Sequence, residues 1–250
     1  MLVLATPFGD NSNRFFQHIH IDSFCRENGV EFINPHLDIY ARTFPRIECG
    51  GFTPNIFDRL MRFFPRLLDA NGADDRAWIL SRASRCRYVK GWGFRAYEEV
   101  VASRSYYRNI FTPTYADDLR LKIDELKRSG SVMSVHIRRG DYRRWQSGRY
   151  FYTDPQYVEI VRRALKTCEN IGTILLFSNE DIEIEAFRSL GANVIVLKSA
   201  WHEEQWMMSL SDYIIGPPST FSGWASYVGN VPLWHVADPT DSVKFTVCNG

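Results

Sequence analysis

Short apolar runs alternate with helix-like stretches throughout the second half of this 250-residue chain. The runs have the length of strands and are SVMSVHI (131–137), TILLFS (173–178), ANVIVL (192–197), DYIIG (212–216) and VPLWHV (231–236). Strands that are buried on both faces read as continuous apolar runs, and parallel neighbours need a long crossover between them, usually a helix. The alternation therefore predicts an α/β fold with a parallel, doubly wound sheet.

The stretches between these runs carry helix signals. Leu119, Ile123 and Leu126 recur at helical spacing. Asp154 and Pro155 make a suitable N-cap and first turn for the helix that follows them. The remaining helices of this half are expected at 181–190, 203–211 and 219–229.

The first half begins with one more β-α-β unit. MLVLAT (1–6) and VEFIN (30–34) read as strands around a helix at 14–28. Residues 52–68 read as one or two helices, and RYVKGWGF (87–94) alternates like a strand. Turn residues near 112–118 place a boundary there, which predicts two domains, 1–115 and 116–250.

Charge and cysteine usage narrow the class of protein. Thirty Lys and Arg against 29 Asp and Glu give a formal charge of +1, so no global field recruits nucleic acid. Residues 1–10 resemble neither a signal peptide nor a membrane span. Five scattered cysteines lack metal-type spacing, and their odd number argues against a secreted disulfide framework. We therefore expect a cytoplasmic protein, although a Golgi protein cut from its anchor would have a similar composition.

The strand at 131–137 ends in unusual charge, in the segment SVHIRRGDY. Ligands of open parallel sheets bind outside the carboxyl ends of the strands, where His136, Arg138, Arg139 and Asp141 are expected. An arginine suits a phosphate because its planar fork donates two charge-assisted hydrogen bonds. One arginine would hold a diphosphate, and its neighbour would hold Asp141 or a nearby loop. The alternative is a surface turn with a solvated charge pair.

Other candidate site residues follow later strands. Ser219 and Thr220 precede a helix, so they could cap it while its free amides face an anion; a plain N-cap is the alternative. Glu204, taken alone, reads as a solvated first-turn glutamate. His136 on an apolar strand reads as a core histidine when taken alone. No D-x-D motif occurs, so we predict no metal site.

At this point the sequence resembles a family. HIRRGD (136–141) matches the HxRRxD signature of the α-1,2-fucosyltransferases and of the related O- and α-1,6-fucosyltransferases. Further segments resemble motifs of that family in the same order: FGDNSNRFFQ (8–17), KGWGF (90–94), LLFSNEDIE (175–183) and EEQWMMSLSDYIIGPPSTFSGWASYVGN (203–230). The resemblance covers nearly the whole chain.

The resemblance implies the metal-independent glycosyltransferase architecture called GT-B, with two Rossmann-like domains and, here, a short N-terminal acceptor domain. It implies that Arg138 binds the donor diphosphate, that His136 lies by the nucleoside and that Asn13 lies near the sugar. It also places Glu204 at a guanine-recognising position and Ser219 and Thr220 at a phosphate-binding helix start.

The implied activity is inverting transfer of fucose from GDP-β-L-fucose to a sugar hydroxyl, with Asp141 or Asp10 as the base. Departures from the family pattern, such as Ser12-Asn13-Arg14, leave the acceptor and the donor sugar open. Transfer from another GDP-sugar and a non-catalytic nucleotide- or glycan-binding module are the alternatives. The expected partners are therefore a nucleotide sugar and a glycan.

A basic run interrupts the first half without an acidic residue. Its members are Arg82, Arg85, Arg87, Lys90 and Arg95. Such a run is typical of a solvated face. Contact with an acidic glycan or a lipid-linked pyrophosphate, and so peripheral contact with a membrane, is the alternative.

Overall fold

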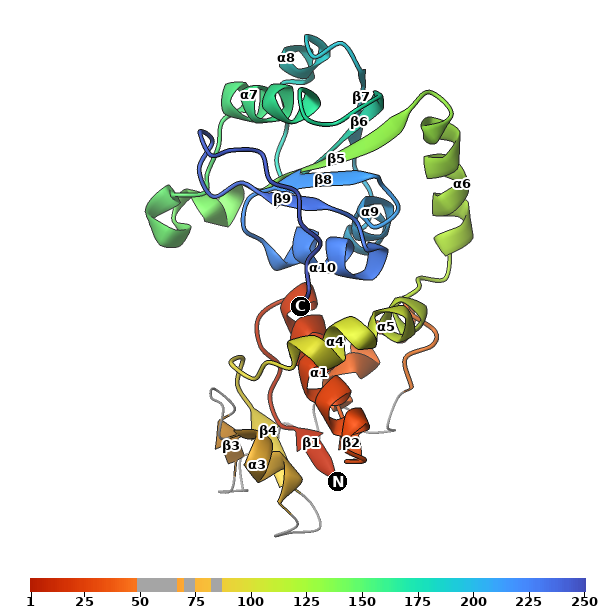
Figure 1. The fold of residues 1–250 in the computed structure, drawn as a ribbon, viewed down its shortest axis with the longest axis vertical. Helices are drawn as coiled ribbons and strands as arrows, with labels where there is room; N and C mark the ends of the chain where they lie inside the picture. Colours follow the sequence, from red (N-terminus) through yellow and green to blue (C-terminus); the bar gives the residue numbers. More distant parts are fainter. Residues whose placement is uncertain (49–66, 70–74, 82–86) are drawn as a thin grey trace. The chain divides into compact units, whose positions relative to one another are not determined.

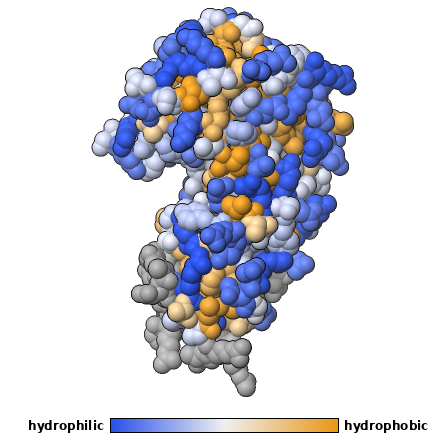
Figure 2. All heavy atoms as spheres, viewed as in Figure 1, coloured by the Kyte–Doolittle hydropathy of each residue, from blue (hydrophilic) through white to orange (hydrophobic). Residues whose placement is uncertain are grey.

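The computed structural model describes residues 1–48, 67–69, 75–81 and 87–250, which form two units (Figure 1). The first unit comprises Met1–Thr114 with Asn249–Gly250, and the second comprises Tyr115–Cys248. None of the helices in these ranges is long and apolar enough to cross a membrane. Hydrophilic residues cover most of the visible face, with smaller apolar areas between them (Figure 2).

The second unit is built on a five-stranded sheet in which all neighbouring strands are parallel. In spatial order the strands are β7 (Asn193–Leu197), β6 (Ile171–Ser178), β5 (Ser131–Ile137), β8 (Tyr213–Gly216) and β9 (Leu233–His235). Every apolar run of the second half is therefore a strand, and the predicted parallel sheet is confirmed.

Helices cover both faces of this sheet (Figure 1). One face packs against α7 (Asp154–Leu165) and α8 (Ile184–Arg188). The other packs against α6 (Ala116–Lys127), α9 (Trp201–Met208) and α10 (Thr220–Gly229). Successive strand residues point to opposite faces, so Val132 belongs to one apolar cluster and Met133 to the other.

The strand order of this sheet reverses at one place. From β5 the chain winds outward through β6 and β7, and then returns to the other side of β5 to form β8 and β9. The loops that leave β5 and β8 therefore depart in opposite directions, and the crevice between them is where open α/β sheets bind ligands.

The first unit has a four-stranded parallel sheet. Its spatial order is β2 (Phe32–Ile33), β1 (Leu2–Leu4), β4 (Arg87–Lys90) and β3 (Leu67–Asp69). The helical elements are α1 (Asn11–Glu27), the 3₁₀ helix η1 (Pro35–Tyr40), α3 (Asp75–Leu80), α4 (Tyr97–Ala102) and α5 (Arg104–Ile110). Ile21 and Phe24 of α1 pack against Leu2 and Leu4 of β1. The strand order reverses again here, between β1 and β4.

Three local predictions differ from the structure. The helices predicted at 52–68 lie outside the described residues up to 66, but Leu67 and Leu68 belong to a strand, so the prediction is wrong there. The strand predicted at 87–94 ends at Lys90, because Gly91 turns the chain with a φ of 100°. Finally, Thr153 is the N-cap of α7, and Asp154 is its first residue.

Candidate active site

Two loops meet at the crevice of the second sheet. The first leaves β5 at Arg138 and forms the 3₁₀ helix η2 (Gly140–Arg143). The second leaves β8 and leads through Pro218 to α10. The hydroxyl of Tyr142 donates a hydrogen bond to the carbonyl oxygen of Pro218 at 2.6 Å, so the two loops are joined directly.

Arg138 is the arginine that faces solvent at this edge. Its Nη2 lies 2.9 Å from Oδ1 of Asp141, and its side chain is 35% exposed. The centre of its guanidinium group lies 5.7 Å from the centroid of the Tyr142 ring. A guanidinium group has five N–H donors, so this single ion pair leaves donors of Arg138 for an anion.

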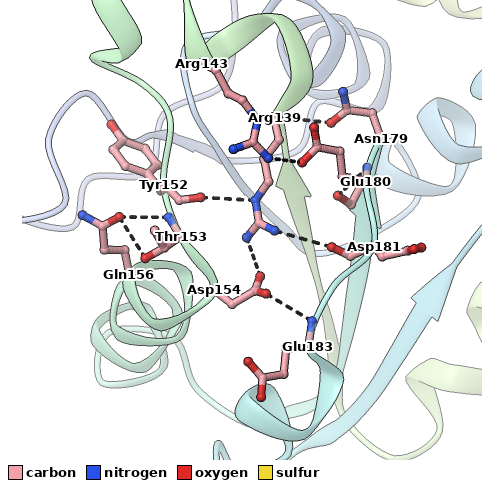
Figure 3. Close-up of polar contacts among 11 residues, drawn as sticks. Arg139, Arg143, Tyr152, Thr153, Asp154, Gln156, Asn179, Glu180, Asp181 and Glu183 are labelled. Atoms are coloured by element: carbon pink, nitrogen blue, oxygen red, sulfur yellow. Dashed lines mark hydrogen bonds and ion pairs between the residues drawn. The ribbon is translucent and has the colours of Figure 1, made fainter.

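Arg139 has the opposite environment (Figure 3). Its buried guanidinium group forms an ion pair with Asp154 and donates hydrogen bonds to the carbonyl oxygens of Tyr152, at 3.3 Å, and Asp181, at 3.5 Å. The other carboxylate oxygen of Asp154 accepts from the amide of Glu183 at 3.1 Å. The sequence left two roles open for the second arginine, to hold Asp141 or to hold a nearby loop. Arg139 holds neighbouring loops, and Asp141 pairs with Arg138 instead.

The loop after β6 supports the backbone of the arginine pair (Figure 3). Oδ1 of Asn179 accepts from the amide of Arg139 at 2.9 Å, and Oε1 of Glu180 accepts from the amide of Gly140 at 3.0 Å. Glu180 also pairs with Arg143 at 2.7 Å, which lowers the pKa of its carboxyl group. Sequence reasoning assigned no role to Asn179 or Glu180; the only signal was their place in the segment LLFSNEDIE.

His136 lies beneath this edge as a neutral, buried imidazole. Burial, followed by the charges of Arg138 and His235, lowers its pKa to about 3. Its ring centroid lies 5.1 Å from that of Phe221, and its Nδ1 is buried with no hydrogen-bond partner among the described residues. Buried polar atoms without a partner are rare in native proteins, so Nδ1 is a candidate ligand contact.

The start of α10 has the form expected for an anion site. Ser219 is confirmed as its N-cap, because Oγ of Ser219 accepts from the amide of Phe221 at 3.2 Å. The first-turn amides of Thr220 and Ser222 have no acceptor among the described residues. These amides and the helix dipole give the N-terminal end of α10 positive potential.

Glu204 lies in the first turn of α9. Its Oε1 accepts a hydrogen bond from the amide of Ser199 at 3.0 Å, and burial raises the pKa of its carboxyl group. The next residue, Gln205, donates to the carbonyl oxygen of Phe221 at 2.9 Å, which joins α9 to the start of α10. One carboxylate oxygen of Glu204 is therefore engaged by Ser199, which precedes the N-cap of α9, and Oε2 is left for another partner.

Asp10 and Asn13 belong to the first unit, whereas the residues described above belong to the second. Asp10 is the N-cap residue of α1, but its exposed side chain makes no capping hydrogen bond. Asn13 lies over Gly9, where a Cβ atom would come within 2.4 Å of Nδ2 of Asn13. Among the described residues, no three His, Cys, Asp or Glu side chains are grouped to hold a metal ion.

A comparison with protein families decides the identity. The model described as glycosyl transferase family 11 matches residues 84–245, which is more than half of the chain. The chain belongs to glycosyl transferase family 11. The resemblance to α-1,2-fucosyltransferases in the sequence is thereby confirmed at the level of the family.

One curated relative of this family 11 chain is an alpha-1,2-colitosyltransferase of Escherichia coli. It is 26% identical over an alignment of 142 residues, and the match covers 53% of this chain and 48% of the relative. The match therefore spans about half the length of that relative.

Solved structures similar to this family 11 chain confirm its fold. Fucosyltransferase NodZ from Bradyrhizobium has a TM-score of 0.58 at 15% identity, over 98% of this chain and 97% of NodZ. A mutant of Arabidopsis thaliana FUT1 in complex with GDP has a TM-score of 0.59 at 12% identity, over 94% of this chain and 70% of FUT1. POFUT1 in complex with GDP-fucose has a TM-score of 0.55 at 11% identity, over 91% and 93%. The α/β fold with two parallel sheets is thus shared with fucosyltransferases.

Proposed function

We propose that this family 11 chain is an inverting glycosyltransferase of GT-B architecture that transfers fucose from GDP-β-L-fucose to a sugar hydroxyl in an α-1,2 linkage. One observation carries the proposal: the loop that bears Arg138 and the loop that leads into α10 are joined, at the carboxyl ends of β5 and β8, by the hydrogen bond from Tyr142 to Pro218. The second unit would be the donor domain and the first unit the acceptor domain.

The reaction needs positive potential where the leaving group departs. The acceptor hydroxyl attacks the anomeric carbon, the bond from that carbon to the diphosphate oxygen breaks, and GDP leaves with the electron pair. Arg138 and the open amides of Thr220 and Ser222 would stabilise the negative charge that develops on the diphosphate. Fixed donors of this kind contribute about 2.7–4 kcal/mol each to a transition state.

The proton of the acceptor hydroxyl must pass to a base. Asp141 is engaged with Arg138 at 2.9 Å, an arrangement that suits it to orient the arginine. Asp10 is exposed and has no side-chain capping bond. We therefore favour Asp10 as the base and Asp141 as a positioning residue.

The nucleoside would lie along α9 and α10. Oε2 of Glu204 would accept from guanine, which has the N1–H and 2-amino donors that adenine lacks. The unpartnered Nδ1 of His136 would contact the nucleoside, and Asn13 would lie near the sugar. We expect no metal requirement, because oriented donors can neutralise a diphosphate without an ion.

The donor sugar has a second candidate. The curated relative is a colitosyltransferase, so a colitosyl donor is favoured over other replacements for fucose. A non-catalytic nucleotide-binding module on the same fold is the alternative from another class.

Donor turnover in the purified chain tests these proposals. The panel is GDP-fucose, GDP-colitose, GDP-mannose, a UDP-sugar and a CMP-sugar, and release of the nucleotide is measured by chromatography with and without a glycan mixture. We expect release from GDP-fucose and little from the UDP- and CMP-sugars. Tight binding of GDP without turnover of any donor would support the non-catalytic module, and absence of GDP binding would refute the site itself.

A further inference from the structure

The loops that leave two neighbouring strands of the first sheet carry a stacked aromatic pair that no role assigned so far explains. Phe8 lies in the loop after β1, and Trp92 lies in the loop after β4. Their ring centroids are 4.9 Å apart, and the ring planes differ by 18°, so the rings are stacked. β1 and β4 are neighbours at the point where the strand order reverses, which is where ligands of such sheets bind.

A buried amide side chain fixes both loops. Gln17 of α1 is only 2% exposed. Its Oε1 accepts from the amide of Phe8 at 3.0 Å, and its Nε2 donates to the carbonyl oxygens of Gly91, at 2.7 Å, and Thr6, at 3.3 Å. The backbones that carry the two rings are therefore held in place before any ligand binds.

One member of the pair is exposed to solvent. Phe8 is 43% exposed, although it contacts Trp92 closely. The guanidinium carbon of Arg95 lies 4.5 Å from the centroid of the Trp92 ring, and Arg95 also donates to the carbonyl oxygen of Phe94 at 2.8 Å. Trp92 thus has protein contacts of its own, while Phe8 offers an aromatic surface to solvent.

A carboxylate residue follows Phe8 closely along the chain. Asp10 follows Phe8 by two residues, so their Cα atoms are at most about 7 Å apart. Its side chain is exposed and makes no capping hydrogen bond with α1. An aromatic face and a nearby carboxylate complement a pyranose, because the ring C–H groups of the sugar are apolar and its hydroxyls donate hydrogen bonds.

We propose that the Phe8–Trp92 pair is the stacking platform for the acceptor pyranose, with Asp10 accepting a hydrogen bond from one of its hydroxyls. This inference deepens the proposed function and rests on it, because only a glycosyltransferase activity makes the bound pyranose an acceptor. It assigns Phe8 and Trp92 as residues that determine acceptor affinity, and it places the hydroxyl next to the carboxylate that we favour as the base.

Saccharide binding by the whole purified chain tests the platform without catalysis. Saturation-transfer NMR is recorded with methyl β-D-galactopyranoside, methyl β-D-glucopyranoside, methyl α-D-mannopyranoside, lactose and cellobiose, each titrated to obtain a Kd. The variants are Phe8→Leu and Trp92→Leu, which keep apolar volume but remove the aromatic face, and Phe8→Tyr, which keeps the face. Tyr97→Leu is the matched control, because Tyr97 is a 50% exposed aromatic residue of the same unit on α4. Thermal unfolding verifies that each variant is folded.

We expect at least one saccharide to bind, with the strongest saturation on its ring C–H protons. Phe8→Leu and Trp92→Leu should raise its Kd about 2- to 10-fold, the size of an aromatic stacking contribution, whereas Phe8→Tyr and Tyr97→Leu should stay within about twofold. The platform is refuted if both leucine variants at Phe8 and Trp92 bind like the wild type, or if none of the saccharides binds. GDP binding and donor turnover by the wild type report separately on the proposed function, so the two can fail independently.

Discussion

The same substitution at the two adjacent arginines of the site should lower the stability of the fold by very different amounts. Arg139→Met removes a buried cation and leaves the carboxylate of Asp154 without its partner; the two side chains are only 8% and 13% exposed. Breaking a buried ion pair from one side costs about 3–5 kcal/mol. For a chain of this size about 1 kcal/mol moves Tm by roughly 2–4 °C, so we expect Tm to fall by about 6–20 °C.

Arg138→Met is the matched control on the neighbouring residue. Its ion pair with Asp141 is much more exposed, at 35% and 59% of the two side chains, and such pairs contribute about 0–1 kcal/mol. Urea unfolding followed by circular dichroism gives both free energies of unfolding. An Arg139→Met variant within about 1 kcal/mol of the wild type, or an equal loss in Arg138→Met, would refute the separation of roles.

Three further predictions concern protonation, the base and metal. The pKa of His136 is lowered from 6.5 to about 3, so below pH 6.5 the unfolded chain binds more protons than the folded chain. The contribution of His136 to stability is therefore complete above pH 6.5 and is lost as the pH falls toward 3, by about 2 kcal/mol between pH 7 and 5. His136→Gln should remove this contribution to the pH dependence in unfolding titrations. Calorimetry should show that wild type prefers GDP over ADP and that Glu204→Gln loses about tenfold or more of the preference; equal wild-type affinities would remove the assignment. EDTA should leave donor turnover within about twofold, and loss with full recovery on adding Mn²⁺ would reveal a missed metal site.

The second unit could be predicted from the sequence because its strands bury both faces. Runs such as TILLFS are too apolar to lie on the surface and too short to form a buried helix, so both their composition and their length indicate a buried strand. The short strand at Leu67–Asp69 has no such signal, since it follows a stretch rich in aromatic residues and proline that favours helix by pattern. Asp154 has the right residue type for an N-cap, but its carboxylate is engaged by Arg139 and Glu183, and Thr153 is the N-cap instead.

The sequence predicted at which edge of the sheet the candidate site lies, but not which residues contact one another there. Placing charged residues after an apolar strand is enough to expect Arg138 at the ligand side of a sheet. The bond from Tyr142 to Pro218 joins residues 76 positions apart, and no local pattern reports such a pairing. The burial of Arg139 likewise depends on partners from two distant segments, at 152–154 and at Asp181. The residue pattern therefore could not decide which of the two adjacent arginines is free to bind an anion, and only the resemblance to the family named Arg138.

The central claim is that Arg138 and the start of α10 bind the diphosphate of a GDP-sugar, and the affinities of GDP and guanosine test it most directly. The two ligands differ only in the diphosphate, so calorimetry of both isolates the contribution of that group. We predict that wild type binds GDP far more tightly than guanosine, and that Arg138→Lys loses about tenfold or more of this difference because an ammonium group cannot donate bidentately. Arg144→Lys, at an exposed position of the same loop, should keep the difference. Equal losses in both variants, or an unchanged difference in Arg138→Lys, would contradict the account.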